Sequence, residues 1–248
     1  MKKLLYIMML AVVFACDSEQ ANDCFQTTGT TVQKTVTVAG FDKILVNKNI
    51  QLILKQGPDT EVVVETGKNL MGDIAVSVVN SKLVLLDNNA CNFVRDYAPT
   101  KVYVTAPNIS EIRTSTQFEI VSEGVLGYDS LKLYSEDFNE SETFTVGDFR
   151  MQLNCNQVSI VSNNISSFYL SGAVNELTVA FYAGTGRFEG AGLMAQKVTI
   201  NHRGSNDIKV NPQQELKGVL RGIGDLIAVN HPPIVTIEQL YTGTLIFQ

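Results

Sequence analysis

Residues 168–208 read FYLSGAVNELTVAFYAGTGRFEGAGLMAQKVTINHRGSNDI, and they carry the strongest pattern in the chain. An apolar anchor recurs in them about every 20 positions, and the repeat continues on both sides. The first row of anchors is Phe149, Phe168, Phe188, Ile208, Leu226 and Leu245, and the second row is Val158, Leu177, Val198, Leu216 and Val235. Most anchors have another apolar or small residue two positions further on, which is the period of a strand with one buried face.

The spacing between the two rows limits how these strands can be joined. The distance from an anchor of one row to the next anchor of the other row is 8 to 11 residues. This distance is too short for a helical crossover between parallel strands. An antiparallel meander or a sandwich accepts this spacing but does not relate a residue to the one 20 positions later. A parallel β-helix does relate them, because equivalent residues of successive coils lie one strand spacing, about 4.8 Å, apart. The pattern therefore favours an all-β solenoid in which Phe149, Phe168 and Phe188 stack inside the coil.

Glycine-rich segments precede three of the first-row anchors. They span 184–186, 204–207 and 222–225, and they combine Gly with Asn and Asp. These residue types tolerate the positive φ angles of sharp corners. We therefore expect a corner of the coil at each segment.

Residues 32–110 lack this repeat and contain alternating apolar segments separated by turn residues. The predicted antiparallel hairpins join 50–55 to 61–65 across Gly57-Pro58-Asp59, and 74–79 to 83–86 across Asn80-Ser81. The coils of about 20 residues then occupy 111–248.

The N-terminus is typical of an exported protein. Lys2 and Lys3 precede an apolar stretch from Leu4 to Phe14, which is short for a membrane span but suits a signal peptide. The following Ala15-Cys16 resembles a bacterial lipobox, so residues 1–15 are predicted to be a lipoprotein signal peptide with Cys16 acylated. A soluble secreted protein is the alternative. Residues 16–31 are polar and aperiodic, which predicts a flexible tether to the membrane anchor.

Three further cysteines follow Cys16. Export permits disulfides, and Cys24 and Cys91 both lie in polar, Asn-containing surroundings, which favours their pairing. Free thiols, with Cys155 buried as a small apolar residue, are the alternative.

Charge argues against a nucleic-acid partner. The 248 residues contain 19 Lys and Arg against 25 Asp and Glu, a formal net charge of −6. A chain of this composition has no extended basic face to neutralise phosphates.

The corner segments carry a family resemblance. Gly184-Thr185-Gly186-Arg187-Phe188, Gly204-Ser205-Asn206-Asp207-Ile208 and Gly222-Ile223-Gly224-Asp225-Leu226, with Phe41-Asp42-Lys43-Ile44 near the N-terminus, resemble the family of "putative auto-transporter adhesins" with a head GIN domain. That family repeats Gly-Ser-Gly-(Asn/Asp)-Ile before its strands. Here Asn206 replaces a glycine, and Asn163-Asn164 stands where glycine is common, so the exact limits of each coil stay open.

The resemblance covers residues 32–248 and implies one GIN-type domain. It implies a right-handed parallel β-helix of pectin-lyase-like shape, with the antiparallel hairpins at its N-terminal end. It further implies an exported lipoprotein of the Bacteroidetes type, in the outer membrane or at the cell surface, with no established activity.

Motifs for catalysis are missing from the sequence. Its two histidines, His202 and His231, form no zinc motif, and no Gly-x-Ser-x-Gly elbow is present. We therefore expect no catalytic residue, no metal and no cofactor.

The enzymatic alternative is a calcium-dependent polysaccharide lyase or glycan hydrolase that uses corner residues. Its candidates are Arg187, Glu189, His202, Arg203, Asp207, Arg221 and Asp225. The pairs Arg203/Arg221 and Asp207/Asp225 are each 18 residues apart, so their members are expected on neighbouring coils. The structural interpretation is that these residues keep the corners solvated and capped.

The preferred function is a non-enzymatic adhesion module that presents a regular face to a glycan or a surface protein. Candidate ligand contacts are the corner cluster of Arg203, Asp207, Arg221 and Asp225. Aromatic candidates for contacts are Tyr97, Tyr103, Tyr128, Tyr134, Phe138, Tyr169 and Tyr182, all of which also suit sheet packing.

Overall fold

The computed structural model describes residues 24–89, 91–95, 98–138 and 143–248. The predicted signal peptide, Cys16 and the tether up to residue 23 lie outside the described residues. In the described ranges the chain is all-β apart from one 3₁₀ turn, Met71–Asp73. Among the described residues, no helix is long and apolar enough to cross a membrane.

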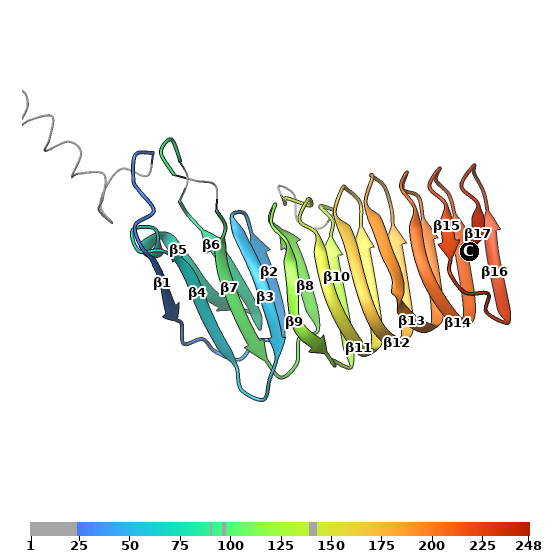
Figure 1. Cartoon of the computed structure of the whole chain (residues 1–248), viewed down its shortest axis with the longest axis horizontal. Coiled ribbons are helices and arrows are strands. Elements are labelled where there is room, and N and C mark those ends of the chain that lie inside the picture. The colour runs from blue at the N-terminus through green and yellow to red at the C-terminus, as the bar shows by residue number, and fades with distance from the viewer. Residues whose placement is uncertain (1–23, 90, 96–97, 139–142) are drawn as a thin grey trace, which may run out of the picture.

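Seventeen strands form one curled, mixed sheet in the described part of the chain (Figure 1). The strands before the repeat are β1 (Thr31–Thr35), β2 (Lys43–Asn47), β3 (Ile50–Gln56), β4 (Glu61–Gly67), β5 (Ile74–Val79), β6 (Lys82–Asp87) and β7 (Thr100–Ala106). The others are β8 (Glu111–Ser115), β9 (Ile120–Leu126), β10 (Ser130–Ser135), β11 (Phe149–Ser162), β12 (Ser167–Phe181), β13 (Arg187–His202), β14 (Ile208–Leu220), β15 (Leu226–Ala228), β16 (Ile234–Gln239) and β17 (Leu245–Phe247).

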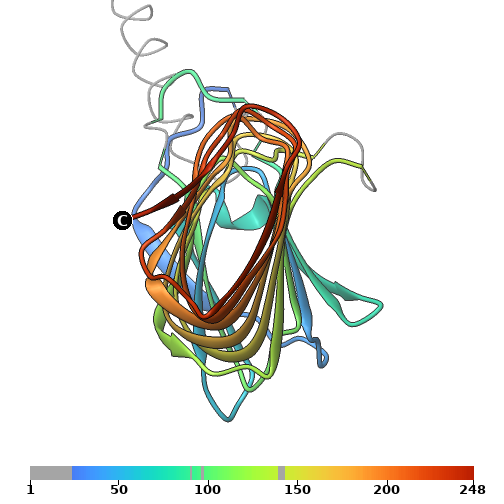
Figure 2. The same cartoon turned by 90° about the vertical axis from the view of Figure 1, so that its right-hand side faces the viewer.

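Strand pairing divides this sheet into two faces, which enclose a flattened outline when viewed along the long axis (Figure 2). Face A runs in the order β1, β4, β7, β3, β9, the first halves of β11 to β14, β15 and β17. Face B runs in the order β5, β6, β2, β8, β10, the second halves of β11 to β14, and β16. Each long strand bends from one face to the other, so its two halves serve both.

The predicted stacking of the two anchor rows is confirmed. Phe149 pairs with Phe168, Phe168 with Phe188, and the row continues through Ile208 and Leu226 to Leu245. The second row pairs in the same way from Val158 to Val235. All these pairings are parallel, so the repeat does not form an antiparallel meander.

The space between the faces is filled by the side chains of the anchors. Phe149, Phe168 and Phe188 are fully buried, and the first two rings stack with centroids 4.9 Å apart and planes within 7°. Burial alternates along each strand, as the period-2 pattern requires. Removing these apolar side chains from water is the main stabilising contribution to the fold.

One of the two predicted hairpins is confirmed and the other is wrong. β5 and β6 pair antiparallel around Asn80 and Ser81, whose positive φ angles are those of a type I′ turn. β3 and β4 do not pair, because β7 lies between them, parallel to β3 and antiparallel to β4. The turn at 57–59 therefore connects two strands that lie on opposite sides of β7. The position beside β3 is occupied by β7, which has alternating apolar side chains.

The order of the first coils in space differs from their order in the sequence. β2 lies between β6 and β8 on face B, and β3 lies between β7 and β9 on face A. Ile44 is therefore stacked between Leu83 and Ile112. The chain leaves this coil, builds its neighbour on one side, and then returns to continue on the other.

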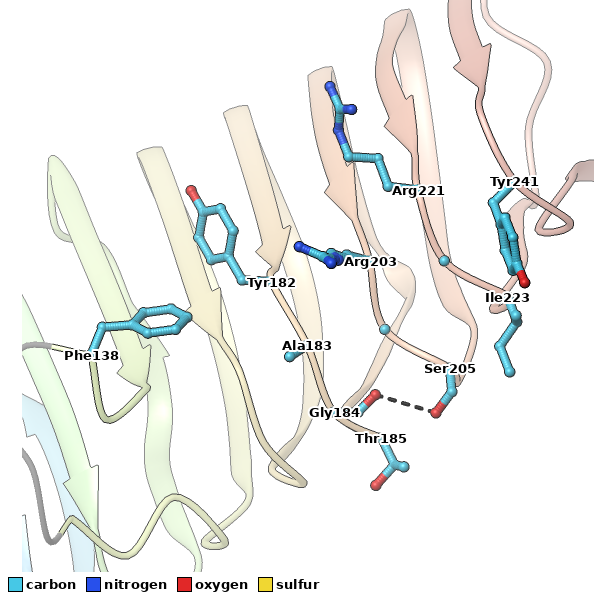
Figure 3. Close-up of a pocket in the computed structure, with 12 residues that line it drawn as sticks. Phe138, Tyr182, Ala183, Gly184, Thr185, Arg203, Ser205, Arg221, Ile223 and Tyr241 are labelled. Atoms are coloured by element: carbon cyan, nitrogen blue, oxygen red, sulfur yellow. Dashed lines mark hydrogen bonds between the residues drawn. The ribbon is translucent and has the colours of Figure 1, made fainter.

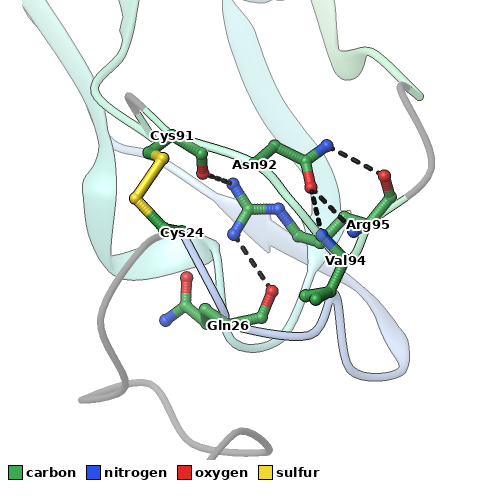
Figure 4. The surroundings of a disulfide bond; sticks show 6 residues. All are labelled: Cys24, Gln26, Cys91, Asn92, Val94 and Arg95. Atoms are coloured by element: carbon green, nitrogen blue, oxygen red, sulfur yellow. Dashed lines mark hydrogen bonds between the residues drawn. A yellow bond between two sulfur atoms is a disulfide. The ribbon is translucent and has the colours of Figure 1, made fainter.

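A disulfide fixes the first described residue to the domain (Figure 4). It joins Cys24 to Cys91, as the sequence predicts. The Arg95 guanidinium donates to the backbone carbonyls of Gln26 (3.1 Å) and Cys91 (2.8 Å), which ties the two segments together a second time. Cys155 is a free, buried thiol.

Gly184 is predicted to be essential at its corner. Its φ of +86° lies in the left-handed region, and an added Cβ would overlap the backbone carbonyl of Asn164 in the previous coil. We expect Gly184→Ala to lower the free energy of unfolding by about 2 kcal/mol or more, because strain and overlap act together. Gly72→Ala is the control, since a Cβ there has open space. Chemical denaturation measures both variants, and equal stabilities would contradict the assignment.

Candidate functional site

One edge of face B carries a column of exposed side chains immediately after the strands end. Tyr182, Arg203, Arg221 and Leu240 each follow the last residue of β12, β13, β14 and β16. Each of these residues donates its backbone N–H to a carbonyl of the previous coil, at 2.6 to 2.9 Å. The parallel register therefore places the four residues in line along the long axis.

Stacked glycine corners form the floor beside this column. Ser205 donates its backbone N–H to the Gly184 carbonyl at 3.0 Å, and Gly243 donates to Gly222 at 3.1 Å. The absence of side chains at Gly184, Gly204 and Gly222 lets these corners approach closely and leaves a depression above them.

The depression is a groove of about 870 Å³, which we call the corner groove (Figure 3). Its lining residues are Phe138, Tyr182, Ala183, Gly184, Thr185, Arg203, Gly204, Ser205, Arg221, Gly222, Ile223 and Tyr241. Phe138, Tyr182, Ile223 and Tyr241 are 43 to 63% exposed, although they are large and mostly apolar. Phe138 and Tyr182 contact each other edge to face, with ring centroids 5.8 Å apart.

The charge of the corner groove comes from its two arginines. Arg203 and Arg221 are both exposed, and none of the described residues that line the groove is acidic. Within the described ranges, neither guanidinium has a carboxylate within salt-bridge distance. The groove therefore combines exposed rings with two cations that no described carboxylate neutralises.

The four-residue corner cluster expected from the sequence is divided by the structure. Arg203 and Arg221 line the groove, whereas Asp207 and Asp225 do not. The Asp207 carboxylate accepts the backbone N–H of Asp225 at 3.1 Å, and the Asp225 carboxylate accepts that of Thr244 at 2.7 Å. These aspartates therefore cap the corner of the next coil, which is the structural role weighed for them.

Two of the remaining lyase candidates pair with each other: Arg187 forms an ion pair with Glu189 at 3.5 Å. His231, which is not one of those candidates, stacks on Phe247, with ring centroids 4.3 Å apart. Across the described residues, no three His, Cys, Asp or Glu side chains come together as a metal-binding group.

His202 is fully buried beneath the corner. It stands in the register column between Phe181 and Leu220, and its Nδ1 accepts the Gly204 N–H at 3.3 Å. Burial lowers the pKa of the imidazole, while the Asn206 backbone carbonyl and the charges of Asp207 and Asp225 oppose the shift. The neutral ring is thus the form that the fold holds at neutral pH.

This burial predicts a pH dependence of stability. A lowered folded-state pKa means that the contribution of neutral His202 is complete above the unfolded value of about 6.5 and is lost as the pH falls through the folded value. We expect the melting temperature to fall more between pH 7.5 and pH 5 in the native protein than in His202→Leu, which matches the Leu220 position above it. Parallel pH profiles for the two proteins would show that His202 does not carry the effect.

The aromatic candidates from the sequence lie in different environments in the structure. Phe138 and Tyr182 line the groove; Tyr169 lies under Arg150 (4.2 Å) and Tyr134 under Arg113 (4.8 Å). Tyr103 is half-buried, and Tyr97 lies outside the described residues. Tyr128 is buried, so of the two roles that the sequence allowed it has the packing role, and burial raises the pKa of its hydroxyl.

Tyr241 and Ile223 were not foreseen as groove residues. The signal that would have found them is their place in the corner segments that follow the second-row strands, where outward residues of successive coils converge.

A family model matches residues 40–232, and its description is "Putative auto-transporter adhesin, head GIN domain". The match covers well over half of the chain. The chain belongs to this family. The resemblance carried by the corner segments is thereby confirmed, and no similar sequence was found among curated proteins.

Several solved structures are similar in fold to this GIN-domain protein. A "putative adhesin" from Bacteroides fragilis matches with a TM-score of 0.77 at 20% identity, covering 90% of this chain and 99% of the other. A "putative adhesin" and a "putative lipid binding protein" from Parabacteroides distasonis match with TM-scores of 0.61 and 0.59 at 16% and 15% identity. Each covers 90% of this chain, with 99% and 98% of its own length. At these identities the likeness concerns the fold.

Proposed function

We propose that the protein is a non-enzymatic, adhesin-type protein of the bacterial cell envelope that binds a glycan or surface-protein ligand in the corner groove. The observation that carries the proposal is the groove itself, where two arginines that no carboxylate of the described residues pairs with lie among exposed aromatic and aliphatic side chains. Monomeric proteins seldom expose such a cluster without a binding role. The adhesin description of the family and of two solved neighbours agrees with it.

We further infer that the parallel part is a right-handed β-helix. The one-coil registers of β11 to β14 support this inference, as does the right-handed preference of parallel crossovers. The antiparallel pairs made by β1, β4 and β5 set the N-terminal end apart.

Binding is tested with the full chain in detergent, assayed on a glycan array and on whole bacterial and host cells. Saturable binding that is lost in Arg203→Ala/Arg221→Ala, but kept in Arg150→Ala, is the expected result. Arg150 is a matched control, because it is 53% exposed and lies outside the corner groove. Failure to bind any glycan or cell would overturn the proposal.

Lipid anchoring through Cys16 is part of the same proposal. The lipobox-like sequence and the tether support it. Metabolic labelling with radioactive palmitate should label the native protein and place it in the membrane fraction. Cys16→Ser should lose the label and be released, and a labelled variant would contradict the assignment.

The lack of enzymatic activity is proposed because the corner carboxylates are used to cap the next coil. The test is incubation with polygalacturonate or alginate and Ca²⁺, while ultraviolet absorbance follows unsaturated products. A rise in absorbance that depends on Arg203 or Arg221 would replace the adhesin proposal with the lyase alternative.

A further inference from the structure

We propose that the ligand of the corner groove is a linear acidic polysaccharide that lies along the long axis of the coil. Its carboxylates would pair with Arg203 and Arg221, and its sugar rings would pack on Tyr182 and Tyr241. This inference rests on the proposed function and names the class of ligand for the same groove.

The first argument is an uncompensated pair of like charges. Arg203 and Arg221 occupy the same position of neighbouring coils, because the residues before them, His202 and Leu220, are register partners. Like charges directly opposite each other on neighbouring strands are destabilising. The chain as a whole has a net charge of −6, so acidic side chains are plentiful, yet none of those that the structure describes lines the groove.

In another register column of face B the stacked charges alternate in sign. Glu176, Lys197 and Glu215 occupy that column, and the Lys197 ammonium lies 3.8 Å from the Glu176 carboxylate. In this column of the same long strands the stacked charges neutralise one another. The contrast indicates that the anion for the two arginines comes from outside the chain.

The second argument is the spacing and order of the groove residues. Along the axis an aromatic ring is followed by two arginines and then by a second aromatic ring, on successive coils about 4.8 Å apart (Figure 3). A ligand that fits must present anionic groups on neighbouring units of a linear chain, with flat apolar surfaces beyond them. A uronic acid chain has both features, since each ring carries one carboxylate and a face of C–H groups.

The chemistry of the contacts also favours carboxylates. An Arg guanidinium binds a carboxylate through two parallel hydrogen bonds, and exposed Tyr rings offer an apolar face with a polar edge. Single-stranded nucleic acid uses similar groups, but it needs a basic surface along its backbone, which an acidic chain with two groove arginines does not supply.

The third argument is that the groove is held in shape before a ligand binds. Stacked backbone hydrogen bonds fix the corners, and Asn206 donates its side-chain amide to the Thr185 carbonyl at 2.6 Å. A preformed floor avoids the entropic cost of ordering a loop on binding.

The test uses the full chain in detergent with four probes: oligogalacturonate, its methyl-esterified form, dextran, and an oligothymidylate. Calorimetry should show binding of oligogalacturonate that weakens with rising salt, because exposed charge pairs are screened. Arg203→Gln/Arg221→Gln should weaken this binding by about tenfold or more, since each charge-assisted pair contributes substantially. Arg150→Gln should leave it unchanged.

A second variant distinguishes a loss of ligand contacts from a loss of folded protein. Arg203→Lys/Arg221→Lys keeps both charges but loses the guanidinium fork, so it should bind with intermediate affinity. Thermal melts of all variants check that the fold is intact.

Each other outcome is decisive. Equal binding of the esterified and acidic chains, or binding of dextran alone, would overturn the acidic ligand while leaving the glycan-binding proposal in place. Tighter binding of oligothymidylate would overturn the polysaccharide class. If neither the probes nor any cell or array glycan bound, the proposed function itself would fail.

Discussion

Replacing Phe168 by alanine is expected to lower the free energy of unfolding by about 3–5 kcal/mol, the cost typical of removing a buried Phe ring. The ring is fully buried and packs against Phe149 and Phe181, with centroids 4.9 and 5.8 Å away. Phe149 belongs to the previous coil and Phe181 to the other end of the same strand, on face B. Neither can collapse into the space, because backbone hydrogen bonds on both faces hold them apart. Denaturant titration followed by circular dichroism measures the loss.

Glu176→Ala is the control for Phe168→Ala in the same strand. The Glu176 side chain is 52% exposed and its ion pair with Lys197 spans 3.8 Å, so its removal should cost no more than about 1 kcal/mol. A similar loss of stability in both variants would show that the internal aromatic column does not carry the stability of the coil.

Removing the Glu136 carboxylate is the second change with a large expected effect. Glu136 and Arg113 form an ion pair at 2.6 Å, and their side chains are only 1% and 8% exposed. Glu136 also accepts the backbone N–H of Phe138 at 2.7 Å, beside the corner groove. Glu136→Ala removes one carboxylate, at 2.6 Å, from the buried Arg113 guanidinium, and losing one member of a buried ion pair is expected to cost about 3–5 kcal/mol.

The double variant Arg113→Met/Glu136→Leu separates charge from packing. Replacing both partners by apolar residues of similar size removes the uncompensated charge, so the double variant should be more stable than Glu136→Ala. If the double variant is instead the less stable of the two, packing around the pair decides its contribution, and the buried-charge explanation is wrong.

The sequence was sufficient to predict the fold of the repeating part because the apolar anchors recur periodically. Phe168 and Phe188 are 20 residues apart, and a parallel coil of that length places them in register without further information. The pairing of Cys24 with Cys91 was also indicated by composition around the two residues, and the structure contains it. Most of the groove column follows from the same period, since Arg203 and Arg221 are 18 residues apart.

The sequence failed where several apolar strands compete for the same neighbours. β3, β4 and β7 all alternate apolar and polar residues, so the turn at 57–59 predicted a hairpin between β3 and β4 that β7 prevents. Side-chain direction at the corners was equally hidden. Asp207 and Asp225 have the same spacing as the arginines, but they turn to the backbone of the next coil.

By itself the sequence determined the strands of the repeat, their register and the family, because equivalent apolar residues recur about every 20 positions. Only the tertiary structure decided that the coil of β2 and β3 lies between two coils made later in the chain. It also decided that two cations, unpaired with any carboxylate of the described residues, share a groove with exposed rings. The physical reason is that pairing between distant strands and the direction of a side chain depend on which surfaces remain to be buried after the chain has folded back on itself. Local residue patterns do not distinguish between the surfaces that could be buried in this way.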